Sequence, residues 1–300
     1  MNATSTRRVV VEGGGTQVVG HVGLHALGSF ADRLGIGGTL SAAVGWHGPG
    51  IPTHDRGKVL TQAMLMLAGG GESCADIEML VSQGRLFGEV ASDTTVYRTF
   101  INTLTPDAVD RARRAWAEVR AGVWRRSSVV GGDGPVILDV DATLVEIHSE
   151  NKDGAAAHFK GGFGFHPLFC FADATGDALS GMLRAGNATA NNTTDLLRVV
   201  DDAISQLPAD ITAGHREGDD AQLVTRRVVV RSDSAGGTHV FTEGLRARNI
   251  GFHVVARSQD AVRAAIVAAN EDPERWTPAV DQDGNRAKTT SDGRQAAVCE

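Results

Sequence analysis

The order of strand-like and helix-like segments after residue 135 constrains the fold of this 300-residue chain more than any single motif does. Three strand-like stretches come first, and the turn signal ATGD makes a hairpin of the second and third. Helices and strands then alternate. The expected segments are strands at 136–147, 162–173 and 177–187, a helix at 191–208, a strand at 226–234, a helix at 238–248, a strand at 251–258 and a helix at 259–270. This order predicts an α/β domain built on a mixed sheet.

The chain before this α/β part has a helical pattern, from about residue 22 to 122. HDRGKVLTQAMLMLAGGG repeats its apolar residues at helical spacing, and SDTTVYRTFINTL and TPDAVDRARRAWAEVRAGVW each open with helix-start residues. The Gly-rich stretch SSVVGGDGP is the natural linker. We therefore expect a helical region at 1–130 and a second domain at 131–300, with a polar tail from residue 271.

Composition limits the class of protein. About 42% of the residues are hydrophobic, enough for a sizeable core, but no run of 18 apolar residues exists. The first twenty residues lack the apolar centre of a signal peptide. The three cysteines are far apart and have no zinc-finger spacing. We expect a soluble cytoplasmic protein with no membrane partner.

Net charge alone argues against a nucleic-acid partner, since the chain carries −7 at pH 7. The charge is uneven, however. Between residues 107 and 132, six arginines stand against three acidic residues. Such a basic helix is either a phosphate-binding surface or an ordinary solvated helix face.

The motif VILDVDATLV interrupts the first expected strand with two aspartates, Asp139 and Asp141. Residues two apart on a strand point to the same face, so the two carboxylates would project side by side. Their repulsion is costly unless a cation sits there, and bound divalent ions would offset it.

One family that carries such a motif is the haloacid-dehalogenase-like phosphatases, whose DxDxT pattern LDVDATL resembles. That resemblance would make Asp139 a nucleophile, Asp141 a general acid and base, and Thr143 a phosphate contact, with Mg²⁺ bound. The fold of that family needs parallel strands joined by helices, whereas the strands expected after this motif form a meander.

The chain also resembles the bacterial insertion-sequence DDE transposases of the group numbered thirteen-eighty. The resemblance runs nearly the whole length, through HDRGKVLTQAMLMLAGGGESCADIEML, LFGEVASDTTVYRTF, ILDVDATLVEIHSE, KGGFGFHPLFCFAD, LRAGNATANNTTDLL and VVVRSDSAGGTHVF. It implies a ribonuclease-H-like catalytic domain of the retroviral-integrase type, in which three antiparallel strands precede alternating helices and strands.

The resemblance also implies site residues and chemistry. It places the metal-binding and catalytic carboxylates at Asp141, before Ala142 and Thr143, and at Asp233 in VVVRSDSAGG; Asp139 remains the alternative ligand on the first strand. Two Mg²⁺ or Mn²⁺ ions would serve DNA cleavage and strand transfer. The partners would be the terminal inverted repeats and target DNA, bound by a homodimer in the nucleoid. The expected DNA contacts are Arg98, Arg111, Arg113, Arg114, Arg125, Arg126, Lys160, Arg184 and Asn187.

The family's third metal ligand is a Glu on a later helix, and no residue of this sequence has that setting. The glutamates nearest to that setting are Glu243, on the helix directly after Asp233, and Glu271, Glu274 and Glu300 in the polar tail. We therefore expect a truncated chain that does not cleave DNA. The alternative is a non-catalytic remnant that binds transposon ends and regulates the intact enzyme.

Overall fold

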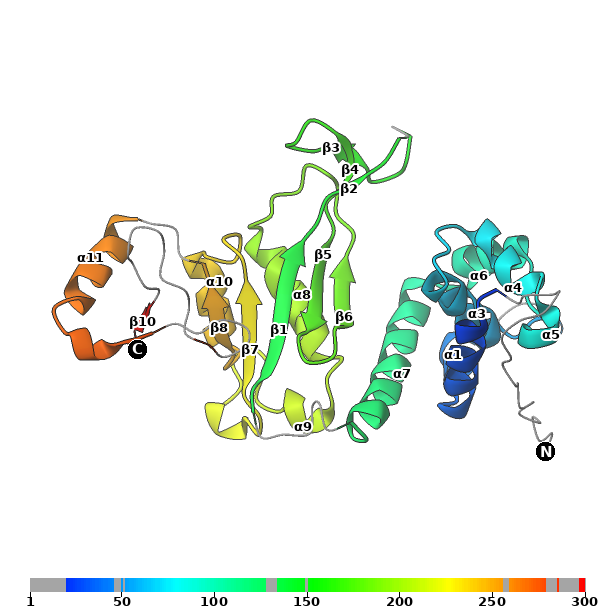
Figure 1. Cartoon of the computed structure of the whole chain (residues 1–300), viewed down its shortest axis with the longest axis horizontal. Coiled ribbons are helices and arrows are strands. Elements are labelled where there is room, and N and C mark those ends of the chain that lie inside the picture. Colours follow the sequence, from blue (N-terminus) through cyan, green and yellow to red (C-terminus); the bar gives the residue numbers. More distant parts are fainter. Residues whose placement is uncertain are drawn as a thin grey trace.

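The structure is a computed structural model that describes residues 20–45, 50, 52–127, 134–148, 151–255, 259–278, 285 and 297–299. A helical part and a part built on a β-sheet stand side by side, and the long helix α7 lies between them (Figure 1). Most of the predicted linker, residues 128–133, lies outside the described residues. Among the described residues, no helix has the length and apolar composition that a membrane span needs.

The described part of the N-terminal region is helical, as its pattern predicts. Side chains at the start of three helices accept the free backbone N–H groups of the first turn: Asp55 before α3, Ser92 before α6 and Thr105 before α7. The elements are α1 (Val22–Arg33), α2 (Ile36–Val44), α3 (Arg56–Ala68), η1 (Cys74–Ile77), α4 (Glu78–Val81), α5 (Gly84–Phe87), α6 (Asp93–Thr103) and α7 (Pro106–Trp124).

Helix α3 is the centre of this region because apolar residues on both of its sides are buried. Val59 and Met66 belong to a core shared with Leu80 and Val96, while Leu60 packs in a second core with residues of α2. Two cores on one helix explain why its pattern is apolar on nearly all sides.

The main sheet has five strands among the described residues, in the order β6-β5-β1-β7-β8. Strand β1 pairs antiparallel with β5, and β5 pairs antiparallel with β6. On its other side β1 pairs parallel with β7, and β7 with β8. The strands are β1 (Val136–Ala142), β5 (Leu168–Ala172), β6 (Asp177–Met182), β7 (Val228–Ser232) and β8 (Gly251–Val254). The predicted ribonuclease-H-like sheet is thus confirmed.

One face of the sheet is covered by α8 (Thr193–Ile204) and α10 (His239–Arg246) (Figure 1). Leu138, Val140 and Val230 point into this core together with Val200 of α8 and Phe241 of α10. Since side chains alternate along a strand, the opposite face of β1 carries the polar positions 139 and 141. Burial of one face therefore fixes where the two aspartates project.

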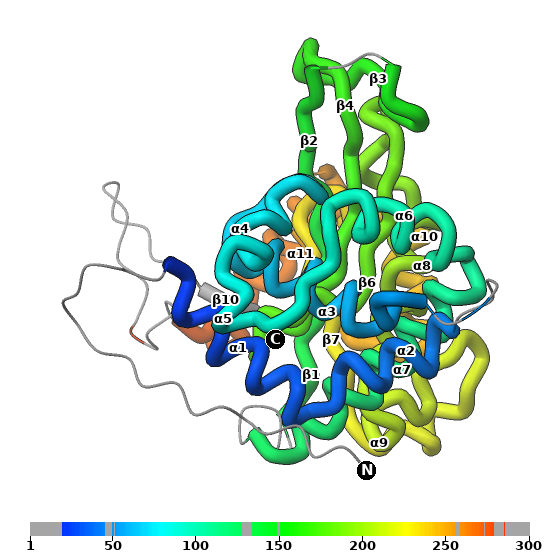
Figure 2. Tube along the Cα trace, turned by 90° about the vertical axis from the view of Figure 1, so that its right-hand side faces the viewer, coloured from blue at the N-terminus to red at the C-terminus, as the bar shows by residue number. Residues whose placement is uncertain are grey.

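A second, small sheet projects beyond the end of β1, as Figures 1 and 2 both show. It consists of β2 (Val145–Glu146), β4 (Phe163–Phe165) and β3 (Ala156–Ala157) in that order. The sequence pattern predicts one strand over 162–173, but His166 and Pro167 separate β4 from β5. Proline has no N–H to donate and ends the first pairing.

The remaining elements connect or follow the sheet. Helix α8 starts at the Asn192 cap, whose side chain accepts the Asp195 N–H, and it ends before Pro208. The other elements are α9 (Ala209–Thr212), η2 (Ala221–Leu223), α11 (Asp260–Ala269), η3 (Pro273–Arg275), β9 (Trp276–Pro278) and β10 (Ala297–Cys299).

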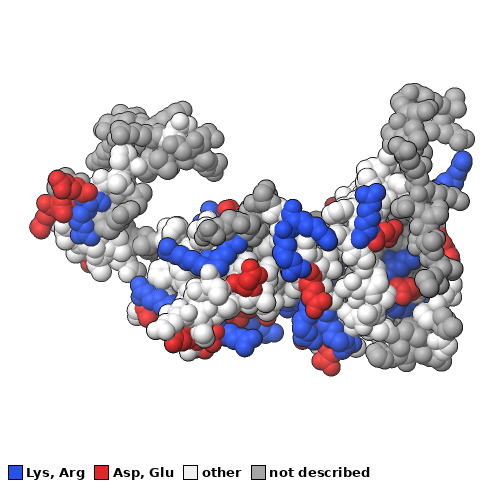
Figure 3. All heavy atoms as spheres, turned by 90° about the horizontal axis from the view of Figure 1, so that it is seen from below, with Lys and Arg blue, Asp and Glu red and all other residues white. Residues whose placement is uncertain are grey.

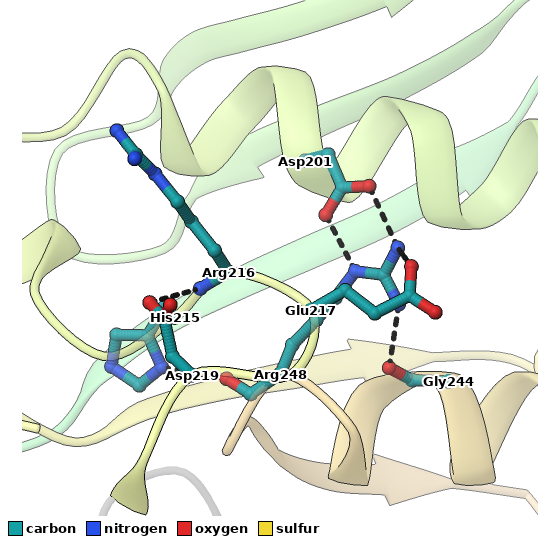
Figure 4. Close-up of polar contacts among 7 residues, drawn as sticks. All are labelled: Asp201, His215, Arg216, Glu217, Asp219, Gly244 and Arg248. Atoms are coloured by element: carbon teal, nitrogen blue, oxygen red, sulfur yellow. Dashed lines mark hydrogen bonds and ion pairs between the residues drawn. The ribbon is translucent and has the colours of Figure 1, made fainter.

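Arg248 ties together the elements behind the sheet (Figure 4). Its guanidinium makes two hydrogen bonds to Asp201 of α8, at 2.6 and 2.9 Å, one to Glu217 at 2.9 Å and one to the Gly244 carbonyl of α10 at 2.9 Å. The hydrogen bonds that Arg248 donates to Asp201 raise the pKa of Arg248. The arginine therefore stays charged and holds α8, α10 and the loop before β7 in one arrangement.

Candidate active site

Asp141 and Asp233 lie at the C-terminal ends of two adjacent inner strands of the main sheet. The parallel pairing of β1 with β7 ends at Val140 and Ser232. Asp141 directly follows Val140, and Asp233 directly follows Ser232. Neighbouring strands lie about 4.8 Å apart, so two backbones that leave the sheet at the same register remain close. Both aspartates are exposed. The strand pairing thus brings together two aspartate positions that are more than ninety residues apart in the sequence.

The turn after Asp233 is held close to the end of β8. A side chain at Gly237 would place its Cβ 2.3 Å from the Val255 carbonyl oxygen, and one at Gly236 would meet Ser232 at 2.6 Å. Only glycine fits at these distances. The Asp233 Oδ1 also accepts the Ala235 N–H at 2.8 Å, which fixes the carboxylate relative to the turn.

The two carboxylates retain oxygens that a hard cation could use. Oδ1 of Asp141 accepts the Ala142 N–H at 2.8 Å, and Oδ1 of Asp233 accepts the Ala235 N–H. Within the described part of the chain, no protein group bonds to either Oδ2 atom. Carboxylate oxygens are the ligands that Mg²⁺ prefers, with water in the remaining positions. The residues fit a divalent cation, although no group of three candidate ligands occurs among the described residues.

Asp139 has a different environment because Arg231 of β7 faces it across the parallel pair. The Arg231 Nε lies 2.6 Å from Oδ1, and Nη2 lies 2.7 Å from Oδ2. The same guanidinium also bonds to Asp173. These hydrogen bonds, first those to Asp139, raise the pKa of Arg231. Both oxygens of Asp139 are therefore engaged by a permanent cation.

Comparison with protein families decides the identity of this fold. The family model described as "Transposase DDE domain group 1" matches residues 1–295. The chain belongs to this DDE transposase family. This family is broader than the thirteen-eighty group, and membership of that group stays a prediction. No curated protein matches the chain significantly.

Solved structures similar to this DDE transposase-family chain include Mos1 mariner transposase. Its catalytic domain is 12% identical, with a TM-score of 0.28 over 53% of this chain and 70% of that one. The Mos1 paired-end complex with Mn is 13% identical, with a TM-score of 0.26 over 75% and 68%. The Mos1 strand transfer complex is 12% identical, with a TM-score of 0.24 over 75% and 67%. Because these scores are low, the fold assignment rests on the strand order and the family.

Some of the residues expected to contact DNA are held inside the transposase-family fold. The Arg111 Nε donates to the Ala43 carbonyl at 2.7 Å, and Arg113 pairs with Asp202 at 3.4 Å. Arg184 is buried and bonds to the His166 and Thr189 carbonyls, and to Asp195 at 3.2 Å. These contacts give the three arginines a structural role.

Other expected DNA contacts are exposed. They are Arg98 on α6, Arg114 on α7, Arg125 and Arg126 at the end of α7, Lys160 in the small sheet and Asn187 after β6. The view from below shows lysine and arginine side chains interleaved with acidic ones (Figure 3). A phosphate backbone would meet separate cations there rather than one continuous basic patch.

The acidic residues weighed as a third ligand differ in their surroundings. Glu243 lies on α10 and bonds to Arg246 at 2.5 Å, with His239 at 3.9 Å. Glu271 and Glu274 are exposed after α11. Glu300 lies outside the described residues.

Arg231 is the site residue that sequence reasoning missed. Its signal in the sequence is weak, because residues 228–230 are three successive valines and all three are buried. Val228 and Val230 belong to the core under α8 and α10, and alternation along the strand then places Arg231 on the face that carries Asp139. The register between β1 and β7 places Arg231 opposite Asp139. The two strands are about ninety residues apart in the sequence, and neither strand alone predicts how they are aligned.

Proposed function

We propose that this chain is a transposase whose site for phosphodiester chemistry is formed by Asp141 and Asp233. The observation that carries the proposal is their position, one residue beyond the last register pair of two adjacent parallel strands. Family membership supports the reaction class. The free Oδ2 atoms support these two residues, rather than Asp139, as the metal ligands.

In this proposal each residue has a separate task. Asp141 and Asp233 hold a divalent ion, Mg²⁺ or Mn²⁺, with two ions in the complete centre. Such ions stabilise the attacking and leaving oxygens in phosphoryl transfer. Gly236 and Gly237 allow the Asp233 turn to pack closely against Ser232 and the Val255 carbonyl. Asp139 positions β1 against β7 through Arg231 and does not bind metal.

The proposed partner is double-stranded DNA at the ends of a mobile element, bound by a homodimer. The exposed Arg98, Arg114, Arg125 and Arg126 would contact phosphates from the helical side, and Lys160 and Asn187 from the side of the carboxylates. Phosphate contacts of this kind position a duplex without reading its sequence. The domain division at residues 130–131 belongs to this proposal as well.

The competing phosphatase hypothesis is not favoured. It needs Asp139 as a nucleophile on a strand with parallel neighbours, but β5 runs antiparallel to β1. Both oxygens of Asp139 are bonded to Arg231, which would have to be displaced before any attack.

Metal titration of single variants tests the site. Mn²⁺ binding to the 300-residue chain, followed by electron paramagnetic resonance, should be lost in Asp141→Asn and in Asp233→Asn, because each variant removes half of the anionic ligands. Asp110→Asn, an exposed aspartate on α7, is the matched control and should bind Mn²⁺ as the parent does. Unchanged binding in both site variants would refute the assignment.

A further inference from the structure

We infer that the turn between β3 and β4 stacks Phe159 on an unpaired base of the bound DNA. The inference rests on the proposed DNA-binding function and names the contact made beside its metal site. Phe159 is 78% exposed. It is the most exposed large hydrophobic side chain among the described residues, and it lies in the turn of a projecting sheet, where a ligand can reach its ring.

The turn that carries Phe159 is built rigidly. The His158 N–H donates to the Gly162 carbonyl at 2.9 Å, the Gly161 N–H donates to the His158 carbonyl at 3.0 Å, and the Lys160 N–H donates to the His158 Nδ1 at 3.3 Å. Gly161 has φ +88°, and a Cβ at Gly162 would lie 2.5 Å from the His158 Nε2. The buried imidazole thus supports the turn from below, and little conformational entropy is lost when Phe159 binds.

The turn lies at the end of the main sheet where the carboxylates are. Strand β2 begins shortly after β1 ends, and the small sheet stands beyond that end of β1 (Figures 1 and 2). The Phe159 ring centroid lies 6.3 Å from that of His166. Leu168, two residues after His166, is the strand partner of Ala142. Phe159 is therefore linked through one ring contact to the residues next to Asp141.

The chemistry of the tip selects a nucleobase. Phenylalanine has no hydrogen-bonding group, so its ring can only pack or stack. The Lys160 Nζ lies 5.8 Å from the Phe159 ring centroid, and Lys160 is exposed. An aromatic face beside a cation fits a base and its phosphate. Bases inside a duplex are covered on both faces, so the accessible partner is an unpaired base.

Fluorescence anisotropy with two labelled DNAs tests the inference. One is an uninterrupted random-sequence duplex, and the other has the same ends and a central bulge of three unpaired nucleotides. Phe159→Ala should weaken binding of the bulged duplex roughly tenfold, as loss of one stacked base does, and leave the uninterrupted duplex within about twofold. Phe159→Trp should bind the bulged duplex as the parent does.

Two controls separate stacking from other effects. Leu223→Ala removes a 56% exposed apolar residue before β7 and should change neither affinity. Lys160→Ala should weaken both complexes equally and lower the salt slope by about one. Equal affinities of Phe159→Ala and the parent for the bulged duplex would overturn the inference. So would a loss of self-association in Phe159→Ala by sedimentation with unchanged DNA affinity. If the parent binds neither DNA, the proposed function fails, and the stacking role fails with it.

Discussion

At the scale of single residues, one cross-strand arginine separates two neighbouring aspartates. Asp139 and Asp141 share a strand and a face, yet only Asp139 lies opposite Arg231. We predict that Asp139→Asn lowers the free energy of unfolding by about 1 kcal/mol, the usual value for a partly exposed ion pair with good geometry. Asp141→Asn should leave it unchanged or raise it, since no cation offsets that charge in the free protein. Urea denaturation of both variants measures this, and the opposite ranking would contradict the assignment.

A second prediction at this scale concerns Cys170, which lies in the sheet core. Burial, and then the nearby Asp139 carboxylate, raise the pKa of its thiol to about 12. Its folded-state pKa exceeds the ordinary 9.0, so its contribution to stability is complete below pH 9 and is lost as the pH rises towards 12. At pH 8 iodoacetamide should modify the half-buried Cys74 well before Cys170. Peptide mapping by mass spectrometry reads this out; equal rates in the folded protein would disprove it.

At the scale of elements, the arginines of α7 divide between a buried inner side that packs and an exposed side that is free to meet DNA. Arg120 is buried and donates to the Gln206 carbonyl at 3.3 Å and the Ala178 carbonyl at 3.4 Å. Burial lowers its pKa, and the Asp177 carboxylate opposes that shift. The Trp124 Nε1 donates to the same carboxylate at 2.8 Å. The inner side of α7 therefore fastens the helical part to the sheet.

We predict from these contacts that Asp177→Ala destabilises the protein by about 2 kcal/mol, because it removes the acceptor of the Trp124 Nε1 and leaves the buried Arg120 guanidinium without its ion-pair partner. Asp202→Ala is the comparison, since its pair with Arg113 is more exposed and should contribute less than about 1 kcal/mol. Thermal unfolding followed by circular dichroism measures both. A larger loss for Asp202→Ala would show that α7 is anchored elsewhere.

Local signals predicted most of the elements but not the way two of them combine. Helix caps at Ser92, Thr105 and Asn192 and the alternation in β1 act within a few residues, so the sequence reveals them. The small sheet was missed because β2 and β3 have only two residues each and owe their existence to pairing with β4. The inward use of Arg111, Arg113 and Arg184 depends on distant carbonyls and carboxylates, which no local pattern contains.

At the scale of the whole molecule, binding of a polyanion by a chain of net charge −7 requires charges to be separated in space. We predict that DNA binding is strongly salt-dependent, and that replacing Arg114, Arg125 and Arg126 together by Ala lowers the slope of log K against log salt by about three. Replacing Arg111, whose side chain is tied to the Ala43 carbonyl, should leave the slope unchanged. Anisotropy titrations over a range of salt concentrations provide the measurement. A slope that changes only when Arg111 is replaced would show that Arg111, and not Arg114, Arg125 and Arg126, contacts the phosphates.

The last prediction joins the metal site to the reaction. Two aspartates can hold one Mg²⁺ with water completing its octahedron, but a second ion opposite the leaving oxygen needs a further carboxylate. Loss of one such ligand commonly costs about 4 kcal/mol in the barrier, which is about a thousandfold in rate. No group of three such ligands occurs among the described residues. We therefore predict that the chain binds Mn²⁺ weakly and leaves DNA uncut.

The measurement is nicking of a labelled terminal-repeat duplex in Mg²⁺ or Mn²⁺, with Asp141→Asn and Asp233→Asn alongside to identify contaminating nuclease. Nicking that persists in both variants does not come from this site. Nicking that either substitution abolishes would contradict the prediction, because it would require a third ligand already in place. Glu243 would then be tested first, as Glu243→Gln, since α10 follows the Asp233 turn directly and its carboxylate would have to leave Arg246 to reach the metal.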